Sequence, residues 1–211
     1  MTDITAYRTI AGAVEAEIEV RRSRFLARLE RVPDEEAARA VVEAARKHHW
    51  DARHHCSAFV LGPGPEVQRS SDDGEPSGTA GAPMLEVLRG RELSDVVVVV
   101  TRWFGGTLLG TGGLIRAYSD AVRAACDAAT VVERRILRRA SINAPVATAG
   151  RLENDLRSRG LHVDGVDYAA TATVHLDVTP EQRTSLDDLV ASMTAGDGIV
   201  VDGEEHWVDL T

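Results

Sequence analysis

Residues 96–122 read VVVVVTRWFGGTLLGTGGLIRAYSDAV, and no other part of the chain constrains the architecture as strongly. Five consecutive valines predict a strand, placed at residues 95–101, with apolar cover on both faces, because a half-exposed strand alternates apolar and polar residues. Apolar residues then recur at spacings of three and four, which predicts a helix over residues 112–129. The glycine-rich connection between them indicates tight turns or a close approach of the backbone to another group.

Working outward, the remaining pattern predicts two α+β units, 1–135 and 136–211. In the first we expect strands around a turn in 15–31, a helix over 34–49 capped by Asp34, a strand over 56–61, a loop over 65–82 and a helix over 83–89. In the second we expect strands at 136–144, 161–168, 170–178 and 197–209, with helices at 145–159 and 180–193. This βαββαβ order predicts a ferredoxin-like sandwich. Gly160 is placed to end the first of these helices, and Thr179, Pro180 and Gln182 to begin the second.

Composition limits the classes of protein that the chain can belong to. It has 211 residues, 44% hydrophobic and 27% charged, which is ordinary for a globular protein. The longest unbroken apolar run, Val96–Val100, is far shorter than the roughly 20 residues of a membrane span. There is no secretory signal pattern, and Cys56 and Cys126 have no paired spacing, so we expect a cytoplasmic protein without a disulfide framework. The net charge of −9 disfavours indiscriminate nucleic-acid binding.

The glycine-rich connection resembles a phosphate cradle, in which backbone N–H groups and a helix N-terminus face an anion. Gly105 and Gly110 have P-loop spacing, but Thr111 replaces the lysine; Gly110 and Gly112 match a dinucleotide fingerprint, but Ile115 replaces its third glycine. Two interpretations stay open. The loop either serves packing alone or binds an anion, with Arg102 and Arg116 as partners. The candidate loop residues are Gly105, Gly106, Gly110, Thr111, Gly112 and Gly113.

A second candidate is the acidic segment SSDDGEPSGTAGAP, residues 70–83. Asp72, Asp73 and Glu75 are suitable ligands for Mg²⁺ or groups for acid–base chemistry. The alternative is a solvated turn, because Asp-Gly and Pro-Ser-Gly are common turn formers. We favour the turn over the metal site and predict neither a bound metal nor a cofactor.

Histidines and aromatic residues supply the remaining candidates. In HHWDARHHC, residues 48–56, adjacent histidines on a strand point to opposite faces and so do not suit one zinc ion. Cys56 with His54 as its base would make a nucleophile, whereas a buried structural cysteine is the favoured interpretation. Arg102, Trp103 and Phe104 either stack on bases or cover the edge of the core, with Arg102 paired to Asp72 or Asp73.

Taken together, four segments resemble the IMPACT/YigZ family: RSRFLA (22–27), ARHHCSAF (52–59), SDDGEPSGTAGAP (71–83) and VVTRWFGGTLLGTGGLIRAYSDAV (99–122). The resemblance implies an N-terminal domain similar to RNase PH and to a ribosomal-protein domain, and a ferredoxin-like C-terminal domain similar to one in a translocation factor. Eukaryotic relatives regulate translation through an additional N-terminal region that this chain lacks. Trp103 stands where the family often has tyrosine.

The resemblance implies a non-enzymatic protein that binds RNA, the ribosome or a translation factor at the glycine-rich loop and regulates translation. The alternative is a magnesium-dependent phosphate-processing enzyme that uses Asp72, Asp73 and Glu75. A third hypothesis makes the C-terminal sandwich a protein-docking surface.

Overall fold

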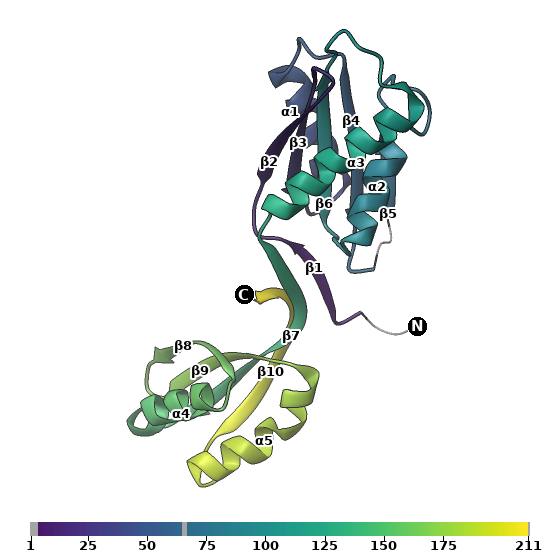
Figure 1. Cartoon of the computed structure of the whole chain (residues 1–211). Helices are drawn as coiled ribbons and strands as arrows, with labels where there is room; N and C mark the ends of the chain where they lie inside the picture. Colours follow the sequence, from purple (N-terminus) through teal and green to yellow (C-terminus); the bar gives the residue numbers. More distant parts are fainter. Residues whose placement is uncertain (1–3, 65–66, 211) are drawn as a thin grey trace. The chain divides into compact units, whose positions relative to one another are not determined.

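A computed structural model describes residues 4–64 and 67–210, which form two compact units (Figure 1). The first unit comprises the chain up to Arg134, joined by Leu210; the second runs from Arg135 to Asp209. Strand β7 passes from the first unit into the second. The elements, in chain order, are β1 (Ala6–Ile10), β2 (Val14–Val20), β3 (Ser23–Arg31), α1 (Glu35–His48), β4 (His54–Leu61), β5 (Val67–Ser71), α2 (Gly81–Gly90), β6 (Val96–Trp103), α3 (Gly110–Ala128), β7 (Val131–Ala144), α4 (Val146–Ser158), β8 (His162–Tyr168), β9 (Ala172–Val178), α5 (Pro180–Thr194) and β10 (Ile199–Leu210).

Strand β6 is the centre of the first unit. It lies in the middle of a five-stranded sheet of order β2-β3-β6-β4-β5, antiparallel to both of its neighbours. Val96, Val98 and Val100 belong to the core shared with α2 and α3. Val97 and Val99 belong to a second core under α1 on the opposite face. The prediction that this strand is covered on both faces is therefore confirmed.

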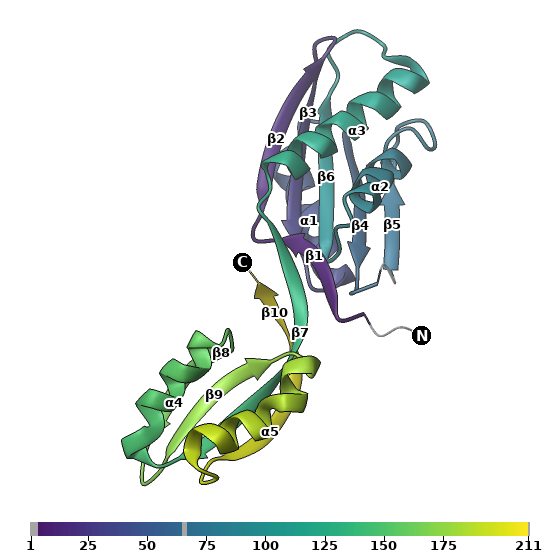
Figure 2. The same cartoon turned by 60° about the horizontal axis from the view of Figure 1, so that its bottom comes forward.

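Successive side chains of β6 point to opposite faces of the sheet, and this alternation decides where Arg102 and Trp103 lie. Arg102 continues the face of Val98 and Val100, towards α3, whereas Trp103 continues the face of Val97 and Val99, towards α1. Figures 1 and 2 show α2 and α3 on one face of the sheet and α1 on the other.

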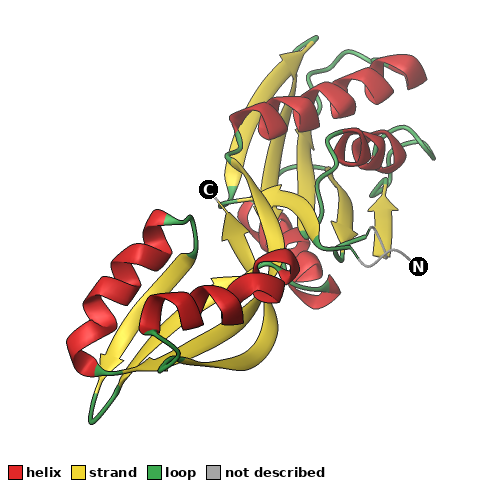
Figure 3. Ribbon diagram, turned by 90° about the horizontal axis from the view of Figure 1, so that it is seen from below, coloured by secondary structure: helices red, strands yellow, loops and turns green. Residues whose placement is uncertain are grey.

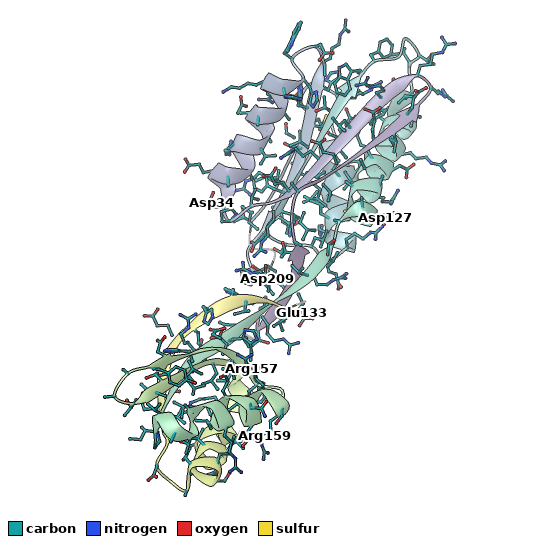
Figure 4. The ribbon with its side chains drawn as sticks, turned by 90° about the vertical axis from the view of Figure 1, so that its left-hand side faces the viewer. Asp34, Asp127, Glu133, Arg157, Arg159 and Asp209 are labelled. Carbon is teal, nitrogen blue, oxygen red and sulfur yellow. The ribbon has the colours of Figure 1, made fainter. Side chains whose placement is uncertain are left out.

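Helix α1 begins where its cap predicts. The side chain of Asp34, labelled in Figure 4, accepts a hydrogen bond from the backbone N–H of Ala37 at 2.8 Å. Glu35 and Glu36 lie in the first turn, and Arg46, Lys47 and His48 in the last, which suits the helix dipole. The basic end of α1 lies close to the start of β4, because Asp73 contacts both Arg46 and the backbone nitrogen of His55.

The expected loop over residues 65–82 is wrong for Val67–Ser71, which form β5 at the edge of the sheet, paired with β4; residues 65 and 66 lie outside the described residues. This strand has no buried side chain, so its sequence lacks the apolar alternation that identifies a strand. Strand β1, which pairs with β7, was also not expected.

The second unit has the predicted βαββαβ order, and its strands lie in the ferredoxin-like order β10-β7-β9-β8. Both helices pack on one sheet face, where Ile142, Leu176 and Leu186 are among the buried core residues (Figure 3). Thr179 and Gln182 form the predicted capping box of α5. Gly160, at φ +79°, follows the end of α4 as predicted. No described helix combines the length and apolar character needed to cross a bilayer.

Gly105 shows why the connection after β6 needs glycine. A Cβ atom there would lie 2.0 Å from the carbonyl carbon of Arg22, in the turn between β2 and β3. The Gly105 N–H also donates a hydrogen bond to Ser23 Oγ at 3.1 Å. The loop after β6 is thus held against the β2–β3 turn by a contact that only glycine allows.

Replacing Gly105 by alanine should lower the free energy of unfolding by about 1–3 kcal/mol, because the backbone of the β2–β3 turn has to move. Gly112→Ala is the matched control: its Cβ would meet no atom within 4 Å. Alanine is also favoured within a helix, so the control should match or slightly exceed the parent protein in stability. Urea unfolding of both variants measures the difference, and equal stability would contradict the close contact.

Candidate nucleic-acid interface

A buried ion pair fixes the acidic loop to the sheet. Arg102 and Glu75 have side chains 7% and 4% exposed, and Arg102 Nη1 lies 2.6 Å from Glu75 Oε1. The hydroxyl of Tyr118, on α3, donates a second hydrogen bond to the same oxygen at 2.7 Å. The expected pairing of Arg102 with Asp72 or Asp73 is therefore wrong: its partner is Glu75, and its guanidinium lies inside the protein.

Cys56 belongs to the same buried cluster. Its thiol lies 3.3 Å from the Tyr118 hydroxyl and 3.0 Å from the carbonyl oxygen of Asp72. Burial raises the pKa of Cys56 to about 12, so the thiolate is not populated near neutral pH. The ring of His54 contacts the carbonyl oxygen of Asp73 and makes no hydrogen bond to Cys56. These contacts favour the structural interpretation of Cys56 over the nucleophile.

Asp72 organises the loop that leads into α2. Its carboxylate accepts hydrogen bonds from the backbone N–H groups of Gly78, Ala80 and Gly81, at 2.8, 3.0 and 2.8 Å. Burial alone would raise the pKa of Asp72, but the three donors outweigh it and lower the pKa. Because α2 has no side-chain cap of its own, Asp72 supplies one from eight residues upstream.

Asp73 connects the same loop to α1 and β4. Its two carboxylate oxygens lie 2.7 Å from Arg46 Nη2 and 2.6 Å from the backbone nitrogen of His55. Asp73 itself adopts φ +42°, a conformation unusual for a residue other than glycine. Burial lowers the pKa of His55, whose ring also contacts the carbonyl oxygen of His49.

The three acidic side chains thus have separate structural partners. Within the described ranges, 4–64 and 67–210, the ligand atoms of Asp72, Asp73 and Glu75 do not converge as a metal-binding group. The geometry favours a structural loop over the alternative of a magnesium-dependent catalytic loop.

The predicted anion seat at the start of α3 is only partly assembled. Helix α3 begins at Gly110, and no side chain caps its first turn. Gly106, Gly110, Thr111 and Gly112 are exposed. Arg102 takes no part in this seat because it is buried against Glu75. Arg116 is 85% exposed and lies 3.7 Å from Asp120, away from the first turn.

Trp103 ends β6 on the α1 side and is held by three neighbours. Its indole N–H donates to Asp51 at 2.9 Å, the edge of the His49 ring packs against it, and the Arg24 guanidinium lies 4.4 Å from its ring centroid. A cleft of about 290 Å³, lined in part by His48, His49 and Thr101, opens beside it. Phe104 is half-exposed, 5.8 Å from the Arg102 guanidinium.

The β2–β3 turn and the connection after β6 meet next to Trp103, and Trp103 contacts His49 and Asp51 in the segment after α1. We call the basic and apolar residues of these three segments the basic–aromatic end: Arg21, Arg22, Arg24, Lys47, Trp50, Arg53, Trp103, Phe104 and Leu108. Trp50 and Leu108 are each 82% exposed. Arg21, Arg22, Lys47 and Arg53 are exposed and make no ion pair with any residue in the described part of the chain. The β2–β3 turn and the connection after β6 meet here (Figures 1 and 2).

The β2–β3 turn is conformationally unfavourable. Val20 and Ser23 are the last paired residues of the hairpin, so Arg21 and Arg22 form a two-residue turn, at φ +48° and +67°. Asn-Gly is the usual sequence for such a turn, because a Cβ atom makes positive φ costly. Two adjacent arginines therefore hold their guanidinium groups at an exposed tip at the expense of stability.

Sequence reasoning missed most of this surface. It selected Arg102 and Arg116, whereas the exposed cations come from Arg21, Arg22 and Arg53. The available signal was the pair Arg21–Arg22 between two strand patterns, where Asn, Asp or Gly is usual. Trp50, beside the two histidines that end α1, was a second signal.

Two family models match the chain: the Impact N-terminal domain over residues 21–126, and a domain of unknown function, DUF1949, over residues 147–197. The IMPACT family member YvyE of Bacillus subtilis is 39% identical over 204 residues, covering 97% of this chain and 94% of the relative. The IMPACT family member YigZ of Escherichia coli is 48% identical over 117 residues, covering 54% and 57%. A solved structure titled as that of a hypothetical protein has a TM-score of 0.62 at 32% identity, covering 96% of this chain and 99% of that one.

Glu75→Ala should lower the free energy of unfolding by about 3–5 kcal/mol, because it leaves the Arg102 charge buried without its carboxylate. Glu86→Ala, which breaks the exposed pair with Arg89, is the control and should cost less than about 1 kcal/mol. Urea unfolding of the two variants provides the comparison. Similar small losses in both would mean that the buried pair does not anchor the loop.

Proposed function

The chain belongs to the IMPACT family, and we propose that it is a non-enzymatic regulatory protein of translation that binds single-stranded RNA, free or exposed on the ribosome, at its basic–aromatic end. The observation that carries this proposal is Trp50, which is 82% exposed in the same segment as Lys47 and Arg53, two cations that make no ion pair with a described residue. Exposed aromatic rings interleaved with arginine suit unstacked bases and phosphates together.

Charge supports a confined interface rather than a broad one. The chain carries a net charge of −9, so the protein as a whole disfavours binding of a polyanion. At the basic–aromatic end the balance is reversed, because Arg21, Arg22 and Arg53 have no acidic partner in residues 4–64 and 67–210, and Asp73 is engaged by Arg46. RNA would therefore be attracted to this end of the first unit.

The geometry also offers separate places for base and phosphate. Trp50 presents a ring for stacking, and the cleft beside His49 offers a concave site of about 290 Å³. The uncapped first turn of α3 leaves backbone N–H groups at Gly110–Gly112 available to a phosphate oxygen. In this proposal the glycine-rich loop assists binding through its backbone, while the charge comes from the β2–β3 turn and the segment after α1.

Trp50→Ala is expected to weaken binding of a fluorescein-labelled oligouridine roughly tenfold or more, because a stacking platform is lost. Stability should not change, since Trp50 is 82% exposed. Tyr168→Ala, which removes an aromatic ring 59% exposed in the second unit, is the matched control. Fluorescence anisotropy gives the affinities; undiminished binding by Trp50→Ala, or no binding by the parent protein, would refute the proposal.

Replacing Arg21–Arg22 by Asn-Gly should have two opposite effects. The free energy of unfolding should rise by about 1 kcal/mol or more, because the positive-φ turn is relieved. RNA affinity should fall, and the slope of log affinity against log salt should lessen by about 1.4, since each phosphate contact on a single strand contributes about 0.7.

Arg151→Gln, at an arginine 87% exposed on α4, is the charge control for the turn variant and should leave the salt slope nearly unchanged. A more stable Asn-Gly variant that retains full affinity and the same salt slope would remove the β2–β3 turn from the interface.

A further inference from the structure

The second unit has one sheet face that carries no helix, and a group of charged and histidine side chains lies there around Asp177. Helices α4 and α5 pack on the face that carries Leu176, so the neighbouring residue Asp177 points to the opposite face. Its direct cross-strand neighbours are His162 on β8 and Arg139 on β7. His206, on β10, lies with its Nε2 atom 3.3 Å from Asp177 Oδ2.

Asp177 is buried without adequate hydrogen bonding. Its side chain is 4% exposed, and the atom Oδ1 receives no hydrogen bond from any residue that the structure describes. The nearest cation to that oxygen is Arg139 Nε at 3.8 Å, beyond hydrogen-bonding distance, on a side chain that is 56% exposed. Removing a carboxylate from water is costly unless it is paired closely, so this oxygen has an unmet requirement for a positive ligand.

Two further ligand groups converge on the same point. One ligand atom each from His162, Asp164 and Asp177 lie within 4.8 Å of one another, and this is the single such cluster in the described ranges 4–64 and 67–210. His162 Nε2 and Asp164 Oδ1 are 3.1 Å apart. Adjacent ligands of a tetrahedral zinc ion lie about 3.3 Å apart, given metal–ligand bonds of about 2.0–2.1 Å.

We propose that His162, Asp164 and Asp177 form a divalent transition-metal site of the zinc class on the helix-free face of the second unit. Asp177 contributes one oxygen of an incompletely hydrogen-bonded carboxylate to the cluster, and the side chains of His162 and Asp164 are 60% and 38% exposed, which leaves them room to turn onto the ion. One imidazole and two carboxylates neutralise a divalent charge and suit zinc better than calcium or magnesium.

The flanking residues set how tightly the ion is held. His206 contacts the other oxygen of Asp177 and orients the carboxylate, as groups around metal ligands commonly do. Arg139 competes with the metal for the Asp177 carboxylate, because both are cations attracted to the same negative charge. With three protein ligands, one tetrahedral position stays open to water or to a carboxylate or imidazole from a partner.

The test is isothermal titration of zinc chloride into the full chain after removal of metals with a chelator. The first unit also contains His48, His49, His54 and His55, so any background binding of zinc to these histidines is subtracted by comparing the parent protein with each variant. We expect His162→Ala and Asp177→Asn each to lose one equivalent of zinc, or to bind it at least tenfold more weakly. Cobalt substitution should give the intense visible absorption of a tetrahedral site, and His162→Ala should remove it.

Two further variants make the test specific. His175→Gln removes a histidine that is paired with Asp167 on the same pair of strands, and it should bind zinc like the parent protein. Arg139→Gln should bind zinc more tightly, because the competing cation is gone. His162 is exposed, so His162→Ala decides the matter even if Asp177→Asn fails to fold.

An unchanged zinc stoichiometry and affinity in His162→Ala would overturn the proposal. So would a parent protein that binds magnesium or calcium at these residues in preference to zinc, or an equal loss of zinc from His175→Gln. None of these readouts depends on RNA binding, so failure of the metal site is distinguishable from failure of the proposed function.

Discussion

The buried pair of Arg102 and Glu75 determines how the whole functional end of the first unit is built. It connects the end of β6 to the loop before α2, and Tyr118 adds α3 to the same oxygen of Glu75. A buried ion pair gives little net stability over an apolar equivalent, but breaking it leaves a lone charge in the core. Its consequence is positional: it ties the loop of residues 72–80 to β6 and α3.

The other two carboxylates of this loop, those of Asp72 and Asp73, also bind groups of the protein itself. Asp72 caps α2, and Asp73 binds Arg46 and the backbone N–H of His55. The negative charge of the segment is therefore balanced by donors within the same unit. Asp72 and Asp73 therefore do not pair with Arg21, Arg22 or Arg53, which make no ion pair with any described residue. The electropositive character of the basic–aromatic end therefore arises from internal neutralisation of acids as much as from the number of bases, which is how an acidic protein can offer a local site to a polyanion.

The sequence predicted most of the architecture but little of the site, and the reasons can be identified for particular residues. The valines of β6, the cap at Asp34 and the box of Thr179 and Gln182 act locally, so their patterns predicted the elements correctly. Strand β5 was not predicted, because this exposed edge strand lacks the alternation of apolar and polar residues that identifies a strand. Arg102 was assigned to the surface because an arginine at a strand end usually lies there. Counting in twos from Val98 and Val100 would have placed it in the core, but its partner Glu75 is set by tertiary folding alone.

Three acidic residues are buried among the described residues, and comparing them shows why one invites a ligand. Glu75 accepts from Arg102 and Tyr118, and Asp95 accepts from the N–H of Gly62 and the hydroxyl of Tyr7. Burial, followed by the contact with Asp95, raises the pKa of Tyr7 to about 12, so the tyrosine stays a donor. In the described part of the chain, Asp177 has only His206 and Arg139 at ion-pair range and no donor on Oδ1. The carboxylates of Glu75 and Asp95 are thus satisfied by donors of the protein itself, whereas that of Asp177 is suited to a metal cation bound from solution.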